Sequence, residues 1–426
     1  MNNLKPSGIE WIGSIPVDWK TVPIYYVAKE VTTKNKTLLR KNAFKFFFGN
    51  IINKPNFNPD EDNYVNKTIR NYIIVNPGDI VINGLNLNFD FVTKRVGMVT
   101  RPGTITSAYI SLRPKANVIL PKYMLYILRT YDSEKAFHNM GGGVRKILNY
   151  DELSKSKIIL PSISAQTRII KFLDKKVSQI DDISKKIQQE ITDLEEYRKS
   201  IITKAVTKGL NPNVPMKDSG IPWIGKIPQN WKIIKGKYLF RLLSKPVKKD
   251  DQVITCFRDG QVTLRVKRRT TGFTMSDQEI GYQGIDKGDL VVHGMDGFAG
   301  AIGISDSRGK GSPVLNVLDS NQDKKYMMYC LRATAQLGVF QALAKGIRVR
   351  SADTRWSTLA NLKYAIPPQS EQANVVNYLS NNSYKLNAII QAKKDLVEKL
   401  NQYKQSIIYE YVTGKKQVPT EEGVQE

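Results

Sequence analysis

The sequence predicts an α+β protein with two pseudo-repeated α/β domains separated by two long helices, which pack as an antiparallel coiled coil. Three observations lead to this fold class: a 13-residue segment that occurs twice, two long heptad stripes, and mixed strand and helix patterns between them. With 426 residues, the chain is long enough for two or three domains with cores of their own.

Internal repetition is the most informative feature of the sequence. Residues 7–19 recur as residues 219–231 at an offset of 212, and nine of the 13 positions are identical. A second repeated block opens with Pro-x-x-x-x-Gln and closes with Tyr-x-x-Ser-Ile-Ile, in both copies at an offset of 206. Between the shared blocks the two copies have diverged. The chain therefore contains two copies of one unit. In each copy the shared segments, called the frame below, enclose an interior whose sequence differs between the copies.

The second blocks, residues 164–208 and 370–413, are predicted to be helices because they carry heptad stripes and contain no proline or interior glycine. Gly209 and Gly414 stand just past their ends, where left-handed caps occur. About 44 residues at 1.5 Å each extend roughly 65 Å, which is too long for a helix that lies on a small domain. Packing the two helices together buries both stripes, and the alternative is that each packs on its own domain.

An antiparallel pair is favoured because a globular domain lies between the helices in the chain. Lys393 and Lys404 depart from the pattern, since they occupy stripe positions in the second helix. The apolar residues assigned to the seam are Leu173, Ile180, Ile187, Leu194, Ile201, Leu379, Leu386, Val397, Leu400 and Ile407.

The interiors, residues 20–160 and 232–366, combine strand and helix patterns and are predicted to be compact α+β domains. The predicted elements are buried strands at 79–82 and 289–292, an alternating strand at 105–112, and short helices at 123–129 and 326–335.

Composition narrows the class of protein. Lys and Arg outnumber Asp and Glu by 65 to 39, a net charge of +26, which favours a polyanionic partner over a basic surface without one. Cys256 and Cys330 are the two cysteines, so no disulfide framework or Cys/His zinc site is expected. No apolar run approaches the roughly 20 residues of a membrane span, and no signal peptide opens the chain. A cytoplasmic protein without membrane contact is expected.

These features resemble the specificity subunit of type I restriction–modification systems, over essentially the whole chain. The resemblance rests on the duplicated Ser-Gly-Ile-x-Trp-Ile-Gly-x-Ile-Pro-x-x-Trp segment, the Gly-Asp-Ile/Leu-Val strands and the two ends of the helical blocks. It implies that each interior is a target-recognition domain that reads one half of a bipartite site in double-stranded DNA. It also implies that the helices are a spacer on which two methyltransferase subunits dock, with the seam residues assigned to docking too.

The resemblance further implies that restriction subunits, which are motor nucleases, join for cleavage. S-adenosylmethionine, ATP and Mg are then expected on the partner subunits only, and the chain itself is expected to be non-catalytic. The expected organisation is a frame with the first recognition domain (1–160), the first long helix (161–210), a second frame with the second recognition domain (211–366), the second long helix (367–414) and a flexible tail (415–426).

The sequence also lacks the motifs that the candidate enzyme classes require. An adenine methyltransferase needs an Asn/Asp-Pro-Pro-aromatic loop, and the nearest match, residues 211–213, lacks the second proline. Residues 309–312 resemble a phosphate loop, but no glycine lies five positions before Gly309. We therefore predict no catalytic and no metal-binding residue.

Basic residues at predicted turns are the candidates for DNA contact, because phosphates dominate the affinity for DNA. The densest cluster is 265–269, with four cations in five residues. For each residue the alternative is a solvated, charged edge. The basic candidates are Lys94, Arg95, Arg101, Arg145, Lys146, Arg265, Lys267, Arg268, Arg269, Arg348, Arg350 and Arg355.

Asn83, Asn86 and His293 follow the Gly-Asp strands and are candidates for reading base edges, with a loop role as the alternative. The repeated tryptophans could stack on bases. A role as core anchors is favoured, because their frame repeats while the interiors diverge.

Two other function classes stay open. One is a DNA-binding enzyme, such as the specificity half of a self-contained restriction enzyme. The other is an RNA-binding or structural adaptor, which predicts no preference among duplex DNA sequences.

Overall fold

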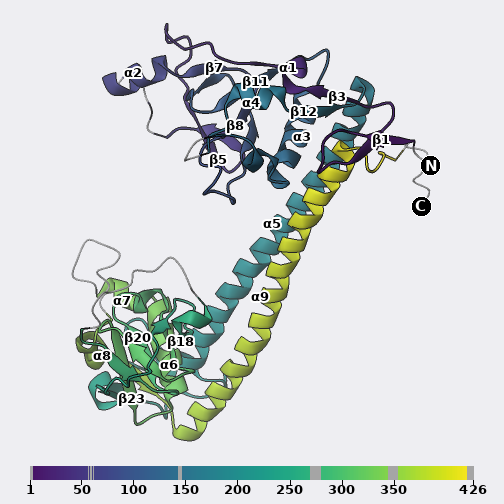
Figure 1. Cartoon of the computed structure of the whole chain (residues 1–426). Coiled ribbons are helices and arrows are strands. Elements are labelled where there is room, and N and C mark those ends of the chain that lie inside the picture. Colours follow the sequence, from purple (N-terminus) through teal and green to yellow (C-terminus); the bar gives the residue numbers. More distant parts are fainter. Residues whose placement is uncertain are drawn as a thin grey trace. The chain divides into compact units, whose positions relative to one another are not determined.

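The computed structural model describes residues 3–55, 57, 60, 62–142, 146–268, 280–343 and 354–419. The chain forms two compact units (Figure 1). Unit 1 comprises Met1–Ile187 and Asp395–Glu426, and unit 2 comprises Gln188–Lys394. The division falls inside both long helices, so each unit holds one half of each helix and one mixed α/β part.

In the described part of the chain, both units contain the same order of strands, and unit 2 has one more short helix, Gly297–Ala299, between its strands Leu290–His293 and Ile302–Ile304. The helices of the mixed part of unit 1 are α1 (Ile24–Val27), α2 (Asn63–Arg70), α3 (Pro121–Ser133), η1 (Ala136–Asn139) and α4 (Tyr150–Lys155). Those of unit 2 are η2 (Gly236–Tyr238), η3 (Arg265–Lys267), η4 (Gly297–Ala299), α6 (Lys324–Gln336), α7 (Val339–Ala342) and α8 (Trp356–Asn361). The long helices are α5 (Ile163–Lys208) and α9 (Gln369–Val412), within one residue of the predicted ranges at each end.

The repeated opening segment folds the same way in both units. In unit 1, β1 (Leu4–Pro6) pairs antiparallel with β2 (Ser14–Pro16), and in unit 2, β13 (Met216–Asp218) pairs with β14 (Lys226–Pro228) in the same register. The strand that follows each hairpin pairs with the strand that precedes a long helix. These pairs are β3 (Lys20–Pro23) with β12 (Lys157–Leu160) and β15 (Lys232–Lys235) with β24 (Lys363–Ile366).

A four-stranded antiparallel sheet forms the centre of each unit, and the Gly-Asp strand is an inner strand of it. The order in unit 1 is β4 (Ala28–Glu30), β11 (Ile110–Pro114), β8 (Ile80–Ile82) and β9 (Val96–Met98). The order in unit 2 is β16 (Phe240–Leu242), β23 (Leu315–Ser320), β20 (Leu290–His293) and β21 (Ile302–Ile304). Because β8 is fully buried and β20 nearly so, the predicted buried strands at 79–82 and 289–292 are confirmed.

Two smaller strand pairs flank each central sheet. In unit 1 they are the hairpin β5 (Phe44–Phe47) with β6 (Asn50–Asn53), and β7 (Ile73–Val75) with β10 (Gly103–Ile105). In unit 2 they are the hairpin β17 (Ile254–Cys256) with β18 (Val262–Leu264), and β19 (Gln283–Ile285) with β22 (Gly309–Gly311). The interiors have thus diverged in sequence without changing their topology.

The prediction of one strand over residues 105–112 is wrong. The chain leaves β10 at Ile105, turns, and enters β11 at Ile110. Thr106 makes this turn: its carbonyl accepts the Tyr109 N–H and its hydroxyl accepts the Ala108 N–H at 3.3 Å. The β-branched and aromatic residues around the turn produce an alternating pattern, which is why the sequence does not reveal the break. The predicted short helices are confirmed as parts of α3 and α6.

The long helices run antiparallel in each unit (Figure 1). In unit 1, Lys404 binds Asp181, while Phe172, nine residues earlier in α5, contacts Tyr411, later in α9. In unit 2, Lys393 binds Glu190. Arg198, which lies farther along α5, donates at 2.8 Å to Oδ1 of Asn387, which lies earlier in α9. As the residue numbers increase along α5, the numbers of the residues contacted in α9 decrease, so the helices are antiparallel, as predicted.

The seam itself is buried, with most of its apolar residues less than a tenth exposed. Lys393 and Lys404, which departed from the heptad pattern, each bind a carboxylate of α5. They therefore keep the register of the pair. Because most seam side chains are buried in the cores of the two units, they are not available to dock other subunits as predicted; Leu194, Val397 and Leu400 keep partial exposure.

Each long helix ends on a copy of the repeated frame. Gly209 and Gly414 have φ of 75° and 74°, the left-handed caps that were predicted. A Cβ on Gly209 would lie 3.4 Å from the Trp231 ring, and a Cβ on Gly414 would lie 3.1 Å from the equivalent Trp19. The end of α5 thus packs on the frame that follows it in sequence, and the end of α9 packs on the frame at the other end of the chain.

A lysine closes each of these contacts. Lys208 donates to the Ile224 carbonyl at 2.9 Å, and Lys415 donates to the Ser14 carbonyl at 3.0 Å. Among the described residues, no helix is both long enough and apolar enough to cross a membrane.

Candidate nucleic-acid interface

Arg95 is not available to DNA in this structure, which corrects the prediction. Its side chain is completely buried, directly before β9. The guanidinium donates to four backbone carbonyls of the preceding loop, including Leu85 O at 2.8 Å and Asp90 O at 2.6 Å. Arg95 therefore folds the loop 83–90 against the sheet, and charge in the sequence could not separate this role from a surface one.

The loop that Arg95 supports carries the other candidates of this region. Asn86 is exposed and has a φ of 54°, a left-handed conformation that asparagine tolerates. Lys94 is exposed at the end of the loop, and Lys146 donates to the His138 carbonyl at 3.1 Å. The structure brings Lys146 to this loop, because the Lys146 carbonyl accepts the N–H of Leu87. Arg101 is exposed in a separate turn before β10.

In unit 2 the densest basic cluster follows the hairpin β17–β18. Lys267 lies in η3 and donates to the Ser307 hydroxyl at 2.9 Å, with Asp306 at 3.8 Å. Arg268 binds Asp259 at 2.8 Å and lies 4.2 Å from the centre of the Phe257 ring. Both side chains keep substantial exposure, so the cluster is a surface cluster fixed at its base. Arg265 is half-buried, with its Nε 3.3 Å from the Thr255 hydroxyl.

Asn83 and His293 occupy equivalent positions at the end of the inner strand of each unit: Asn83 directly follows β8, and His293 is the last residue of β20. Asn83 Oδ1 accepts the N–H of Leu85 at 3.1 Å, and His293 Nδ1 accepts the N–H of Met295 at 3.2 Å. His293 Nδ1 also accepts the Asp296 N–H at 3.0 Å. Burial lowers the pKa of His293, against the raising effect of Asp296. The neutral ring therefore carries its proton on Nε2.

Arg355 is exposed at the start of α8. Four further candidates, Arg145, Arg269, Arg348 and Arg350, lie outside the described residues. The described candidates thus come from several loops of each unit.

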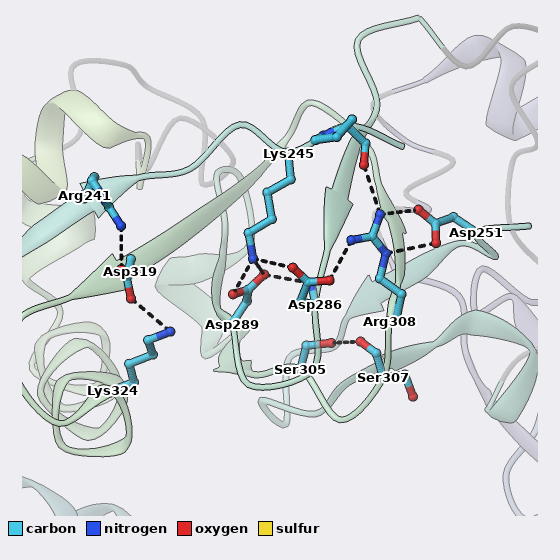
Figure 2. Close-up of polar contacts among 11 residues, drawn as sticks. Arg241, Lys245, Asp251, Asp286, Asp289, Ser305, Ser307, Arg308, Asp319 and Lys324 are labelled. Atoms are coloured by element: carbon cyan, nitrogen blue, oxygen red, sulfur yellow. Dashed lines mark hydrogen bonds and ion pairs between the residues drawn. The ribbon is translucent and has the colours of Figure 1, made fainter. Parts of the chain in front are cut away.

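An ion network that the sequence did not suggest fixes the edge of the second domain (Figure 2). Lys245 binds Asp286 and Asp289, each at 2.7 Å. Arg308 binds Asp286 at 2.6 Å and Asp251 at 2.7 Å. Hydrogen bonds from Lys245 and Arg308 lower the pKa of Asp286 to about 2. These two cations are balanced within the chain and are not candidates for DNA contact.

The Gly-Asp repeat has a structural explanation in the same region. Asp289 also accepts the Asp286 N–H at 2.8 Å, and Asp79, its equivalent in unit 1, accepts the Asn76 N–H at 2.8 Å. Asp79 is bound by Arg113 through two hydrogen bonds of 2.7 and 2.8 Å. A buried carboxylate with two such partners is satisfied, so the aspartate holds the turn before the inner strand.

An arginine at equivalent positions of the two units stabilises the hairpins β5–β6 and β17–β18. This structural role was not predicted from the sequence. Arg129 on α3 donates to the Val96 and Gly49 carbonyls, and Arg332 on α6 donates to the Ile302 and Gly260 carbonyls. Each arginine thus ties the turn of one hairpin to the edge strand of the central sheet. The signal was present in the sequence, because both close the repeated Tyr-Met-x-Tyr-x-Leu-Arg segment.

The glutamine of the Pro-x-x-x-x-Gln block links each long helix to its unit. Gln166 is fully buried and accepts the N–H of Leu120, the residue before α3, at 2.8 Å. Gln372 accepts the N–H of Asp323, the residue before α6, at 3.1 Å. Each glutamine also donates to the proline carbonyl of its own block at 3.0 Å.

The tryptophans are core anchors, as favoured. Trp231 is fully buried and Trp19 nearly so. Trp11 packs edge-on against Tyr131 with ring centres 4.8 Å apart, and Trp223 lies partly buried against the core of unit 2.

The sequence and the fold are similar to those of known proteins. Residues 16–193 match the family described as type I restriction modification DNA specificity domain. The chain is 24% identical over 332 residues to a putative type I restriction enzyme MjaX specificity subunit of Methanocaldococcus jannaschii, covering 72% of this chain and 71% of that protein. It is 22% identical over 419 residues to the MjaVIII specificity subunit of the same organism, covering 94% and 93%.

A solved structure shares the fold. A chain from a study of complex assembly and conformational transition of the type I R-M system superposes with a TM-score of 0.66 at 12% identity, covering 94% of this chain and 99% of that chain. The family match ends inside the first long helix, and the second half of the chain repeats the first in both sequence and topology. Residues 16–193 therefore match the type I restriction modification DNA specificity domain, and over nearly its whole length the chain is similar to type I restriction enzyme specificity subunits.

Proposed function

We propose that this chain reads a bipartite target in double-stranded DNA and directs partner methyltransferase and motor-nuclease subunits to that target. One observation carries the proposal: two domains with the same topology and the same frame differ in the loops that bear the basic and base-reading candidates. Two domains that share a frame but differ in their candidate DNA-contacting loops suit a DNA target whose two halves differ in sequence. The net charge of +26 supplies the general attraction for DNA.

The outer faces of the long helices support docking of two equivalent partners. Unit 1 exposes Ile183 of α5 and Tyr403 of α9, and unit 2 exposes Ile389 of α9 and Tyr197 of α5, each 45–57% exposed. Ile183 and Ile389 are repeat equivalents, as are Tyr197 and Tyr403, at an offset of 206. All four directly precede positions of the two heptad stripes, which are occupied by Ser184, Arg198, Ile390 and Lys404, so in an antiparallel pair the Ile and Tyr of a unit flank the same side. Methyltransferase subunits are the proposed occupants.

As the recognition component, the chain is not expected to supply chemistry. S-adenosylmethionine, ATP and Mg are proposed to bind the partner subunits. We predict that the purified chain shows no stoichiometric binding of S-adenosylmethionine and no ATP hydrolysis. Titration calorimetry and a phosphate-release assay test this directly. A one-to-one complex with S-adenosylmethionine would favour a self-contained DNA-modifying enzyme instead.

Duplex DNA binding tests the recognition role itself. The complex assembled with its methyltransferase subunits is expected to bind one duplex sequence class over shuffled duplexes of the same composition. Equal affinity for all duplexes, or a preference for RNA, would favour the adaptor function.

A further inference from the structure

A charged cavity of about 390 Å³ lies in unit 2, where the long helices meet the hairpin β17–β18 and α6. Its lining includes Arg198 and Lys199 of α5, Arg258 and Asp259 of the hairpin turn, Glu196 and Arg332. The candidate residues selected from the sequence contain none of these six. Four cations against two carboxylates leave the cavity with an excess of positive charge.

The ion pairs do not remove this excess. Lys199 binds Glu196 at 2.6 Å, and Arg258 binds Asp296 at 2.8 Å. Arg198 donates to the neutral amide of Asn387, and Arg332 donates to two backbone carbonyls. In the described part of the chain, neither Arg198 nor Arg332 forms an ion pair with a carboxylate.

Unit 1 contains an equivalent cluster of cations; this cluster and that of unit 2 are called the cationic corners. Lys404 is the repeat equivalent of Arg198, and Arg129 makes the same backbone contacts as Arg332. Lys94 joins them, because a Cβ on Gly49, whose carbonyl accepts from Arg129, would lie 3.1 Å from the Lys94 Cβ.

Partial burial lowers the pKa of the Lys94 ammonium and the charges of Lys404 and Arg129 lower it further, against the raising effect of Asp181 and Asp132. In unit 2, burial likewise lowers the pKa of Arg332 and the charge of Arg198 adds to this, against the raising effect of Tyr329, Cys256 and Asp259. Asp181 binds Lys404 in unit 1, and Asp132 is a second carboxylate whose charge acts on Lys94 and Arg129, so the three cations exceed these carboxylates by one.

Crowded like charges cost free energy unless an anion enters among them. The carboxylates present are too few, and a phosphate group suits the donors, since arginine forks bind phosphate oxygens well. We propose that each of these cationic corners, Arg198 with Arg332 in unit 2 and Lys404 with Arg129 and Lys94 in unit 1, binds a backbone phosphate of the DNA.

The repetition favours DNA over a small anion or an acidic segment of a partner. A long polyanion supplies identical phosphates to both recognition domains whatever sequence each one reads, and the corners repeat although the reading loops do not. The inference rests on the proposed function and adds to it contacts that are independent of base sequence.

The test is the double variant Arg198→Gln, Lys404→Gln in the complex assembled with methyltransferase subunits. Glutamine can still hydrogen-bond to Asn387 or Asp181, so the helix pair is kept. The matched control is Lys393→Gln, which removes another cross-helix cation that lies outside the cavity lining. Affinity for the target duplex and for a scrambled duplex is measured against salt, with thermal unfolding and complex mass measured in parallel.

Removal of two phosphate contacts is expected to lower the slope of log K against log salt by up to ~1.8, about 0.9 per contact. The decrease in affinity should be equal for the target and the scrambled duplex. The Lys393→Gln variant should keep the wild-type affinity and salt slope, and the complex mass of the double variant should equal that of the wild type. An unchanged slope in a variant that still binds its target would overturn the inference and leave the recognition role standing. A decrease in complex mass would overturn it too, because it would make the corners sites for an acidic partner segment. Failure of the wild type to prefer any duplex would contradict the proposed function itself.

Discussion

At the scale of single residues, the same kind of side chain has opposite roles. Arg95 is wholly buried among carbonyls, whereas Arg268 lies at the surface on an aromatic ring. Because phosphate contacts depend on exposed cations, the cluster after β18 is the better test of DNA binding.

Replacing Lys267 and Arg268 with alanine is expected to weaken DNA binding and to lower the salt slope by up to about 0.9 for each phosphate interaction that the substitutions remove. Fluorescence anisotropy at several salt concentrations measures both quantities. The control is Arg241→Ala with Lys324→Ala, which removes two cations that bind Asp319 at another sheet edge (Figure 2). If both double variants changed the slope equally, the cluster would be contributing net charge alone.

His293 is expected to read a base acceptor through its Nε2–H, because Nδ1 is taken by backbone N–H groups. The variant His293→Asn places in unit 2 the residue that unit 1 has at this position. It should keep the local turn, as Asn83 does, and alter the second half-site only. Methylation mapping checks this. An unaltered site would give His293 a purely structural role.

The ion network of Figure 2 predicts a pH dependence of stability. Asp286 has a pKa of about 2, below its ordinary value of 3.8, because Lys245 and Arg308 donate to it. A carboxyl with a depressed pKa stabilises the fold above its unfolded pKa, and this contribution disappears as the pH falls from about 4 to about 2. Asp286→Asn should therefore lower the melting temperature at pH 7 but much less at pH 2.5. An equal decrease at both values would contradict this role.

Residue roles were predictable where repetition identified them and not where charge alone did. The tryptophans and Gly209 with Gly414 were assigned correctly, because their frame and helix ends occur twice. The buried position of Arg95 depends on a loop that closes over it, and the pairing of Lys245 with Asp286 joins residues 41 positions apart. Such long-range contacts leave no local pattern in a sequence.

At the scale of elements, the long helices were the most predictable part. Heptads specify both the helix and its buried face, and the two seam lysines gained partners in α5 that a stripe pattern does not show. The break between β10 and β11 was not predictable, because a turn of β-branched residues has the alternation of a strand.

The helix pair predicts how target spacing responds to insertion. One heptad inserted in each helix, near Ile187 and near Lys393, adds about 10 Å at 1.5 Å per residue, close to three base pairs at roughly 3.4 Å each. The seam stays in register, so the same half-sites should be methylated with a longer spacer. Inserting four residues instead exposes apolar side chains and should destabilise the pair. An unchanged spacer with retained activity would make the helices docking surfaces only.

At the scale of the whole molecule, the matching helix ends predict that the chain tolerates circular permutation. The end of α9 already packs on the first frame without a covalent link, through Gly414 and Lys415, as the end of α5 packs on the second frame. A permuted chain that begins after Gly209 and joins the original termini by a flexible linker should fold with a similar melting temperature and methylate the same sites. A permuted chain that stays unfolded would show that the covalent order is required.

The central claim is that two unlike domains of one chain read the two halves of one DNA target. Genome-wide mapping of methylated bases tests it most directly, in cells with the gene, without it, and with its first recognition domain exchanged for one from another specificity subunit. The account predicts one two-part motif that disappears without the gene, and a motif changed in one half only after the exchange. Methylation that persists without the gene, or an exchange that changes both halves together, would contradict it.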